Sequence, residues 1–254
     1  MVLDAARAAA PVEALTLTQL ALPLSLKDRG VFDSFWAADN AELVAFLVQI
    51  AEAGRQPVPG GHAGCWLWGG EATGKSHLLH AVCERLGEDA VFVPLRRFAD
   101  SGAGILEGLA TRRCICLDDI DAIAGRDDFE LALFDLLNQA ADRHVILVVS
   151  SNAAPRDSGF RLADLQSRLS KLPVFRVEPL DEIGRVNALR LRAGQRGLEL
   201  PEETARFLLS RSRRDMASLY RLLDRLDAEA LAAQRRLTVP FVRSVLQRLD
   251  EATG

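Results

Sequence analysis

Residues 69–76 read Gly-Gly-Glu-Ala-Thr-Gly-Lys-Ser and decide the fold class of this chain. They fit the pattern G-x-x-x-x-G-K-[ST], in which the backbone amides of a loop surround the phosphates of a nucleotide. The apolar run 65–68 is typical of a buried strand, and residues 75–86 carry apolar side chains at helical spacing. A strand, a glycine-rich loop and a helix in this order are the context that phosphate binding requires. The alternative, a chance glycine-rich turn, is disfavoured by these flanking elements.

Each fixed position of the motif has a physical role. Gly69 and Gly74 allow backbone conformations and close approaches that a side chain would block. Lys75 brings a positive charge to the outer phosphates, and the hydroxyl of Ser76 is a ligand for Mg²⁺. We therefore predict a nucleotide site formed by Gly69, Gly70, Glu71, Ala72, Thr73, Gly74, Lys75, Ser76 and His77.

The composition indicates a folded protein without a membrane span. The chain has 254 residues, of which 49% are hydrophobic and 26% charged, enough for one large or two modest domains. Its net charge of −4 argues against a protein that mainly coats nucleic acid. We find no secretory signal and no apolar run near ~20 residues, so we expect a cytoplasmic protein. The four cysteines are expected to be reduced thiols, mostly buried: Cys65, Cys83, Cys114 and Cys116.

Strand and helix signals alternate through the first two thirds of the chain, which predicts an α/β fold with a parallel sheet. The expected strands are 65–68, 90–95, 114–118, 145–150 and 174–177, and the helices in this part are 39–53, 75–86, 128–142 and 161–170. After Pro179 only helical patterns follow, at 181–196, 202–213, 215–234 and 239–249. We expect an N-terminal tail at 1–30, a nucleotide-binding core at 31–178 and a small all-helical lid at 179–254.

Two of the predicted strands end in polar side chains. Asp118 and Asp119 end the strand 114–118, and in a phosphate-loop sheet such an acid is associated with Mg²⁺. We assign the metal to Asp118, while Asp119 takes the position of a water-activating acid that is usually Glu. Asn152, preferred over the preceding Ser151, follows the strand 145–150 and is our candidate for orienting water near the third phosphate. The alternative for Asp118 and Asp119 is that the two acids simply end the strand and cap a helix. The alternative for Asn152 is that it opens a plain turn.

These motifs together resemble the AAA+ ATPases. The loop 69–76, the acidic strand end 117–120, the Ser-Ser-Asn strand end 150–152 and the helical lid carry the resemblance. The stretches Asp-Asp-Ile-Asp at 118–121 and Leu-Ala-Asp-Leu-Gln-Ser-Arg-Leu at 162–169 are similar to the initiator branch typified by DnaA. That resemblance implies that Arg168 is an arginine finger, which acts on nucleotide held by a neighbouring subunit. The alternative is a surface arginine on a helix.

Further features resemble the Hda family, the regulatory inactivators of DnaA. The chain ends directly after the expected lid and its core begins near Val31, so we expect neither a helix-turn-helix domain nor a helicase-loading domain. Residues 19–24 read Gln-Leu-Ala-Leu-Pro-Leu and look like the clamp-binding motif of that family, as residues 235–242 look like its lid. The resemblance assigns clamp binding to Gln19, Leu20, Leu22, Pro23 and Leu24. The alternative is an N-terminal strand packed on the core.

The Hda resemblance implies a regulator of DNA replication initiation. Such a protein binds adenine nucleotide, ADP or ATP, with Mg²⁺, and docks on the DNA-loaded sliding clamp, the β subunit of DNA polymerase III. It stimulates hydrolysis of the ATP bound to the initiator DnaA through Arg168, which prevents over-initiation. The expected protein is cytoplasmic and associated with the nucleoid through the clamp. Direct DNA contact is expected to be weak or absent, and a homodimer is left open.

One position departs from the initiator pattern. The lid arginine that reaches the third phosphate, sensor 2, aligns with Ala217, and the spacing does not favour Arg214 or Arg221 as a substitute. We therefore expect an activator of hydrolysis more than an enzyme, with a weak ATPase activity of its own left open. Phe32 and Phe35 are expected either to flank the base or to pack in the core. The rival interpretations are a self-hydrolysing AAA+ ATPase or loader and a DnaA paralogue that acts on DNA.

Overall fold

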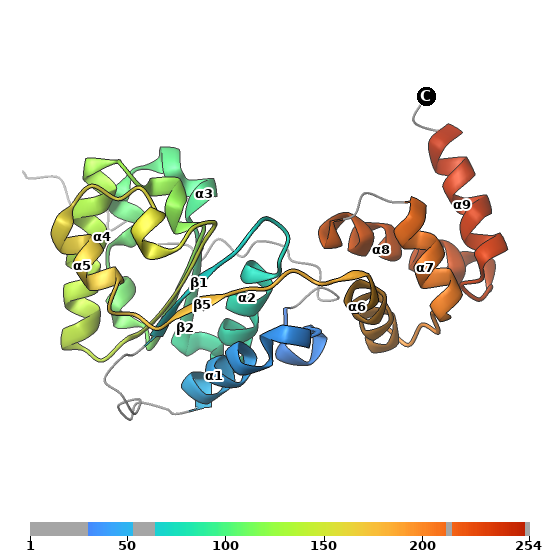
Figure 1. Ribbon diagram of the computed structural model, residues 1–254, viewed down its shortest axis with the longest axis horizontal. Helices are drawn as coiled ribbons and strands as arrows, with labels where there is room; N and C mark the ends of the chain where they lie inside the picture. The colour runs from blue at the N-terminus through green and yellow to red at the C-terminus, as the bar shows by residue number, and fades with distance from the viewer. Residues whose placement is uncertain (1–29, 53–63, 212–214, 252–254) are drawn as a thin grey trace, which may run out of the picture.

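The computed structural model describes residues 30–52, 64–211 and 215–251 (Figure 1). The predicted clamp-binding residues 19–24 and Arg214 lie outside these residues. The predicted core is therefore described except at 53–63, and the predicted lid except at 212–214 and 252–254.

The core is built on a parallel sheet of five strands (Figure 1). The strands are β1 (Gly64–Trp68), β2 (Ala90–Pro94), β3 (Cys114–Asp118), β4 (Ile146–Ser151) and β5 (Val174–Arg176), in the order β2-β3-β4-β1-β5. Every neighbouring pair is parallel, with Trp68 opposite Ser151 and Pro94 opposite Asp118. The carboxyl ends of β1, β3 and β4 therefore meet at one edge of the sheet, where ligands bind in open α/β folds.

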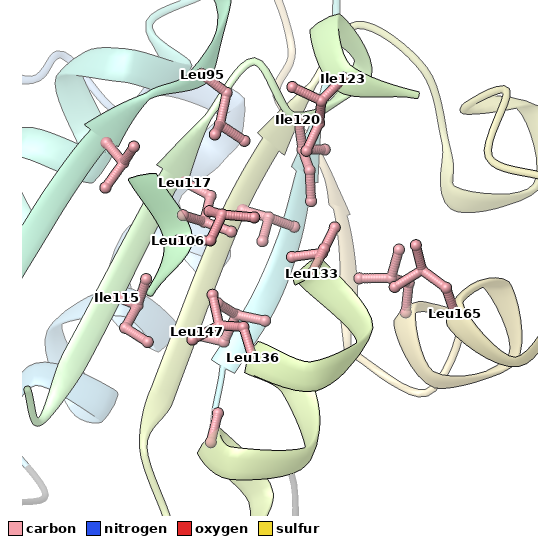
Figure 2. Close-up of a cluster of buried hydrophobic side chains, with 14 of the residues drawn as sticks. Leu95, Leu106, Ile115, Leu117, Ile120, Ile123, Leu133, Leu136, Leu147 and Leu165 are labelled. Atoms are coloured by element: carbon pink, nitrogen blue, oxygen red, sulfur yellow. The ribbon is translucent and has the colours of Figure 1, made fainter. Parts of the chain in front are cut away.

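Helices cover both faces of the sheet because successive side chains of a strand point to opposite faces. Cys114 and Cys116 pack with the apolar stripes of α1 (Ala41–Glu52) and α2 (Lys75–Leu86). Ile115 and Leu117 pack on the other face with α4 (Asp127–Asp142) and α5 (Ala163–Leu169). Figure 2 shows this second cluster, to which the short helix α3 (Leu95–Phe98) contributes Leu95.

The C-terminal part is a helical domain with a hydrophobic cluster of its own. It consists of α6 (Glu182–Gln195), α7 (Glu202–Arg211), α8 (Met216–Ala233) and α9 (Val239–Glu251). Its buried apolar residues, such as Leu189, Leu208, Leu223 and Val242, all come from residues 186–245. Asp181 and Asp215 cap α6 and α8, their carboxylates accepting from the N–H groups of Gly184 at 2.6 Å and Ser218 at 2.7 Å.

The predicted strands and helices lie within two residues of the observed ones over the described residues. One segment differs: the strand expected at 90–95 ends at Pro94, and Leu95 begins α3, which the sequence did not predict. Pro94 has no N–H to continue the ladder, so the chain leaves the sheet there. The four cysteines are free thiols, with Cys83 half-buried and the others buried. None of the described helices has both the length and the hydropathy needed to cross a membrane.

Candidate nucleotide-binding site

The loop between β1 and α2 has a backbone that only glycine allows at one position. Gly74 has φ 100°, and a Cβ there would lie 2.7 Å from Cε2 of Phe35. The positive φ and the close aromatic ring both exclude a side chain. The N-terminus of α2 follows directly at Lys75, so its unpaired amides face the space above the loop.

Lys75 is held inside this loop. Its side chain is buried, and Nζ donates to the carbonyl oxygens of Gly69 and Gly70, both at 2.7 Å. Nζ also lies 3.3 Å from Oδ1 of Asn152 at the end of β4. Burial lowers the pKa of Lys75, while the nearby carboxylates, Asp119 first among them, act in the opposite direction. The ammonium is thus fixed where the outer phosphates of a nucleotide would lie.

The two predicted Mg²⁺ ligands are brought together. The hydroxyl of Ser76 donates to Oδ2 of Asp118 at 2.7 Å. Ser150, which the sequence did not single out, donates to Oδ1 of Asp118 at 2.5 Å. Both ligand atoms are hard oxygens, and Mg²⁺ at such sites takes its remaining ligands from phosphates and water. The pair therefore fits a magnesium ion, although the described residues form no cluster of three His, Cys, Asp or Glu for a metal.

Asp119 and Asn152 belong to one polar network. Asp119 has φ 55°, its N–H donates to Oγ of Ser150 at 2.9 Å, and its Oδ2 accepts from Nε of Arg96 at 2.8 Å. The side-chain amide of Asn152 donates to Oδ2 of Asp121 at 3.0 Å, and Arg96 lies 3.8 Å from that same oxygen. Asp119 is therefore ion-paired in this structure. The sequence did not identify Arg96 or Asp121, because the pairing of β2 with β3 is needed to place them here.

A cavity of about 290 Å³ lies at one end of the loop, between the core and the helical domain. Phe35, Trp36, Leu180, Arg185 and Tyr220 line it together with the loop. Phe32 and Phe35, expected either to flank the base or to pack in the core, both pack on the hydrophobic cluster of α1 and α2, and Phe35 also lines this cavity. Apolar and aromatic walls suit a nucleobase. We call this cavity the base end.

His77 ties the segment before α1 to the loop. Its Nε2 lies 3.0 Å from the carbonyl oxygen of Val31 and 3.0 Å from Oγ of Ser34. Burial lowers the pKa of His77, which favours the neutral form of the ring. His77 thus fixes the segment that carries Phe35 and shapes the base end.

A second cavity lies at the other end of the loop, and we call it the outer-phosphate end. Its walls include Lys75, Ser76, Arg96, Asp119 and Asn152 from the core. Met216, Ala217 and Tyr220 close it from the first turns of α8. The predicted lysine, serine, acid and water-orienting amide thus line one space, and Asp118 is bonded to Ser76 on its wall.

Comparison with known proteins identifies the helical domain. The family model of the Hda lid domain matches residues 182–246. These residues are similar to the lid domain of Hda proteins. The predicted resemblance to Hda proteins is thereby confirmed.

Solved structures share the fold of the core and the lid. Domain III of the replication initiation protein DnaA from Thermotoga maritima is 18% identical, with a TM-score of 0.71 over 86% of this chain and 96% of that one. AMPPCP-bound DnaA from Aquifex aeolicus is 19% identical, with a TM-score of 0.58 over 73% of this chain and 61% of that one. The RuvB Holliday junction branch migration motor of Thermotoga maritima is 15% identical, with a TM-score of 0.57 over 86% and 73%. The predicted AAA+ core with a helical lid is confirmed.

The helical lid brings no arginine of its described residues to the outer-phosphate end. Ala217, the expected sensor 2 position, lines that cavity and carries no charge. Arg221, one turn further along α8, donates to Oγ of Ser218 at 2.9 Å and lines neither cavity. Among the described arginines, only Arg185 lines the base end and only Arg96 lines the outer-phosphate end.

Arg168 lies far from this site. It is exposed on α5, whose Leu165 and Leu169 are buried in the core. Its guanidinium carbon stands 4.9 Å from the ring centre of Phe134 on α4. Arg168 lines neither cavity, and Figure 1 shows α5 and the Hda lid on opposite sides of the sheet. The predicted finger is therefore exposed, oriented by an aromatic ring and remote from the chain's own phosphate loop.

Glu130, which the sequence did not single out, holds the start of α5 in place. Its side chain comes from α4 and is only 2% exposed. The carboxylate accepts from the N–H groups of Gly125 at 2.7 Å, Arg161 at 3.0 Å and Leu162 at 2.7 Å. These bonds fix the residues that lead into α5, and with them the position of Arg168. The sequence alone does not reveal this role of Glu130, because the groups that donate hydrogen bonds to its carboxylate are backbone N–H groups, which any residue carries.

Glu130→Gln should loosen α5 because an amide NH₂ would then face backbone N–H donors. We expect a loss of stability of about 1–3 kcal/mol and faster hydrogen exchange at residues 161–169. Thermal denaturation and hydrogen-exchange mass spectrometry would measure both. Asp142→Asn, an exposed acid on the same helix, is the matched control and should change neither quantity. Unchanged exchange at 161–169 in the Glu130 variant would contradict the role of this carboxylate.

Proposed function

We propose that this chain regulates DNA replication initiation by stimulating hydrolysis of ATP bound to a DnaA-type initiator. It holds an adenine nucleotide, with ADP the favoured form, and Mg²⁺ between its core and its Hda lid. It offers Arg168 to the initiator's nucleotide while its N-terminal motif docks on the sliding clamp. The initiator is thereby converted to its ADP form, which limits further initiation.

The observation that carries this proposal is the position of Arg168. An exposed guanidinium, stacked on Phe134 and remote from the chain's own loop, suits a role on another molecule's phosphates. A trans arginine neutralises the charge that develops on the transferred phosphoryl group. The Hda lid and the DnaA-like fold support the same conclusion, because AAA+ subunits of like shape can assemble side by side.

The direct test follows the fate of labelled ATP on the initiator. A DnaA-type initiator is loaded with radiolabelled ATP and mixed with the purified chain, ADP, and clamp loaded on DNA. We expect conversion to labelled ADP to accelerate only when the chain and the clamp are both present. No acceleration with all components present would refute the proposal.

Substitutions confined to the N-terminal tail test the clamp contact. Replacing Gln19, Leu22 and Leu24 by Ala should abolish retention of the chain on immobilised clamp, because the motif then loses its polar contact and its apolar anchors. Nucleotide binding should not change, since none of these residues belongs to the loop 69–76. Retention of the triple variant at the level of the unaltered chain would show that docking uses another surface.

A second candidate function is ATP hydrolysis by the chain itself. The gathering of Lys75, Ser76, Asp119 and Asn152 around one cavity favours it. The ion pair between Arg96 and Asp119 and the presence of Ala217 in the lid oppose it. Rapid ATP turnover by the purified chain without initiator or clamp would favour this candidate over the regulator.

A further inference from the structure

We propose that Arg96 lets this site distinguish nucleoside triphosphate from diphosphate, in place of an arginine from the lid. The inference rests on the proposed binding of adenine nucleotide and names the core residue that recognises the third phosphate. It predicts that Arg96 contributes to binding of ATP and contributes little to binding of ADP.

The two cavities fix where along a bound nucleotide Arg96 would lie. Both share the loop residues 71–74, His77, Met216 and Tyr220. Only the base end has Phe35, Trp36 and Leu180, and only the outer-phosphate end has Arg96, Asp119 and Asn152. A nucleotide whose base occupies the first cavity extends its phosphates toward the second. Arg96 therefore stands at the third phosphate's end of the site, together with Lys75.

The charges at this end require a second cation. Asp119 and Glu71 line the cavity, and Asp121 accepts from Asn152 of its wall, whereas Lys75 and Arg96 are the cationic residues among the described ones on that wall. Arg96 pairs with both acids, at 2.8 Å from Asp119 and 3.8 Å from Asp121. Without Arg96, the carboxylate of Asp119 would face the third phosphate unscreened. The binding of ATP would weaken more than the binding of ADP, because only ATP carries negative charge to that end of the site.

The ion pairs of Arg96 contribute too little to folding stability to explain why an arginine stands at this position. Its side chain is 57% exposed, and an ion pair at such exposure contributes little to stability. Its contacts with the acids use Nε and one terminal nitrogen, whereas guanidinium offers five N–H donors in a fork that matches phosphate oxygens. Arg96 can hold Asp119 and donate to a phosphate at the same time. That dual role replaces the charge that Ala217 lacks.

Calorimetric titration of the full chain with ADP and with a non-hydrolysable ATP analogue tests the inference. Arg96→Ala should raise the Kd of the analogue about tenfold and leave the Kd of ADP nearly unchanged. Arg96→Lys should recover part of the analogue's affinity. Arg97→Ala, which removes the exposed neighbouring arginine of the same helix, should change neither constant.

The outcomes separate the role of Arg96 from the binding of adenine nucleotide by the chain. Equal Kd changes for the two nucleotides, or no change for the analogue, would overturn the role of Arg96 and leave nucleotide binding intact. An unaltered chain that binds neither nucleotide would overturn both claims. ADP titration also reports on folding, so a variant that retains ADP affinity is folded well enough for the comparison.

Discussion

Arg168→Ala should reduce the stimulated hydrolysis of initiator-bound ATP by about 10³-fold or more. An arginine finger contributes about 10³–10⁵-fold to the rate of phosphoryl transfer in GTPases. The charge that builds on the transferred phosphoryl oxygens would lose the guanidinium that neutralises it. The chain's own nucleotide site lies on the far side of the core from α5 and offers no replacement. The measurement is the rate of labelled ADP formation on the initiator at saturating chain and clamp.

Folding should tolerate this substitution. Arg168 is exposed, and its stacking on Phe134 is a cation–π contact of about 0.5–1 kcal/mol at such a site. Arg156→Ala, another exposed arginine of the core, is the matched control and should keep full stimulation. Arg168→Lys should remain strongly impaired, because an ammonium cannot contact two phosphate oxygens in the planar fork of guanidinium. Stimulation by Arg168→Ala at the normal rate would remove the finger assignment.

Sequence reasoning located the nucleotide loop because its determinants are contiguous. The loop 69–76 and the helix 75–86 follow from glycine positions and apolar spacing over one short stretch, and the structure has the helix at the same residues. The acids at 118–119 were found for the same reason, since they directly end an apolar strand. Local patterns of this kind do not depend on which strands are neighbours.

The rest of the site depends on strand order, which local patterns do not contain. Arg96 reaches Asp119 because β2 lies beside β3, with Pro94 opposite Asp118. Ser150 reaches Asp118 because β4 lies on the other side of β3. Apolar periodicity predicts that a strand exists and leaves its neighbours undetermined. The sequence likewise left open whether Phe32 and Phe35 flank the base or pack in the core, because the cavity that Phe35 lines is formed by segments far apart in the chain.

Lys75→Ala should weaken binding of both ADP and ATP by about 30-fold or more. Removing one partner of a buried charge pair commonly costs about 2–5 kcal/mol, which corresponds to at least that factor. Lys75 is buried against the carbonyl oxygens of Gly69 and Gly70, so the variant loses the expected phosphate contact and also the bonds that shape the loop. Both nucleotides should lose affinity, because the loop that Lys75 holds through Gly69 and Gly70 is the one expected to surround the phosphates that ADP and ATP share. Calorimetric titration with each nucleotide measures the effect.

Two further variants separate charge from packing at this position. Lys75→Met keeps an unbranched apolar stem and removes the ammonium, so it should bind nucleotide as poorly as Lys75→Ala while unfolding at a higher temperature. Lys171→Ala removes the other lysine of the described residues, which is exposed and lines neither cavity, and this variant should bind nucleotide normally. Because Arg96 is expected to act on the third phosphate, whereas Lys75 also holds the loop around the phosphates that both nucleotides share, the ratio of ATP to ADP affinity should fall in the Arg96 variant and change far less in the Lys75 variants. Normal nucleotide affinity in Lys75→Met would contradict the assignment of the loop itself.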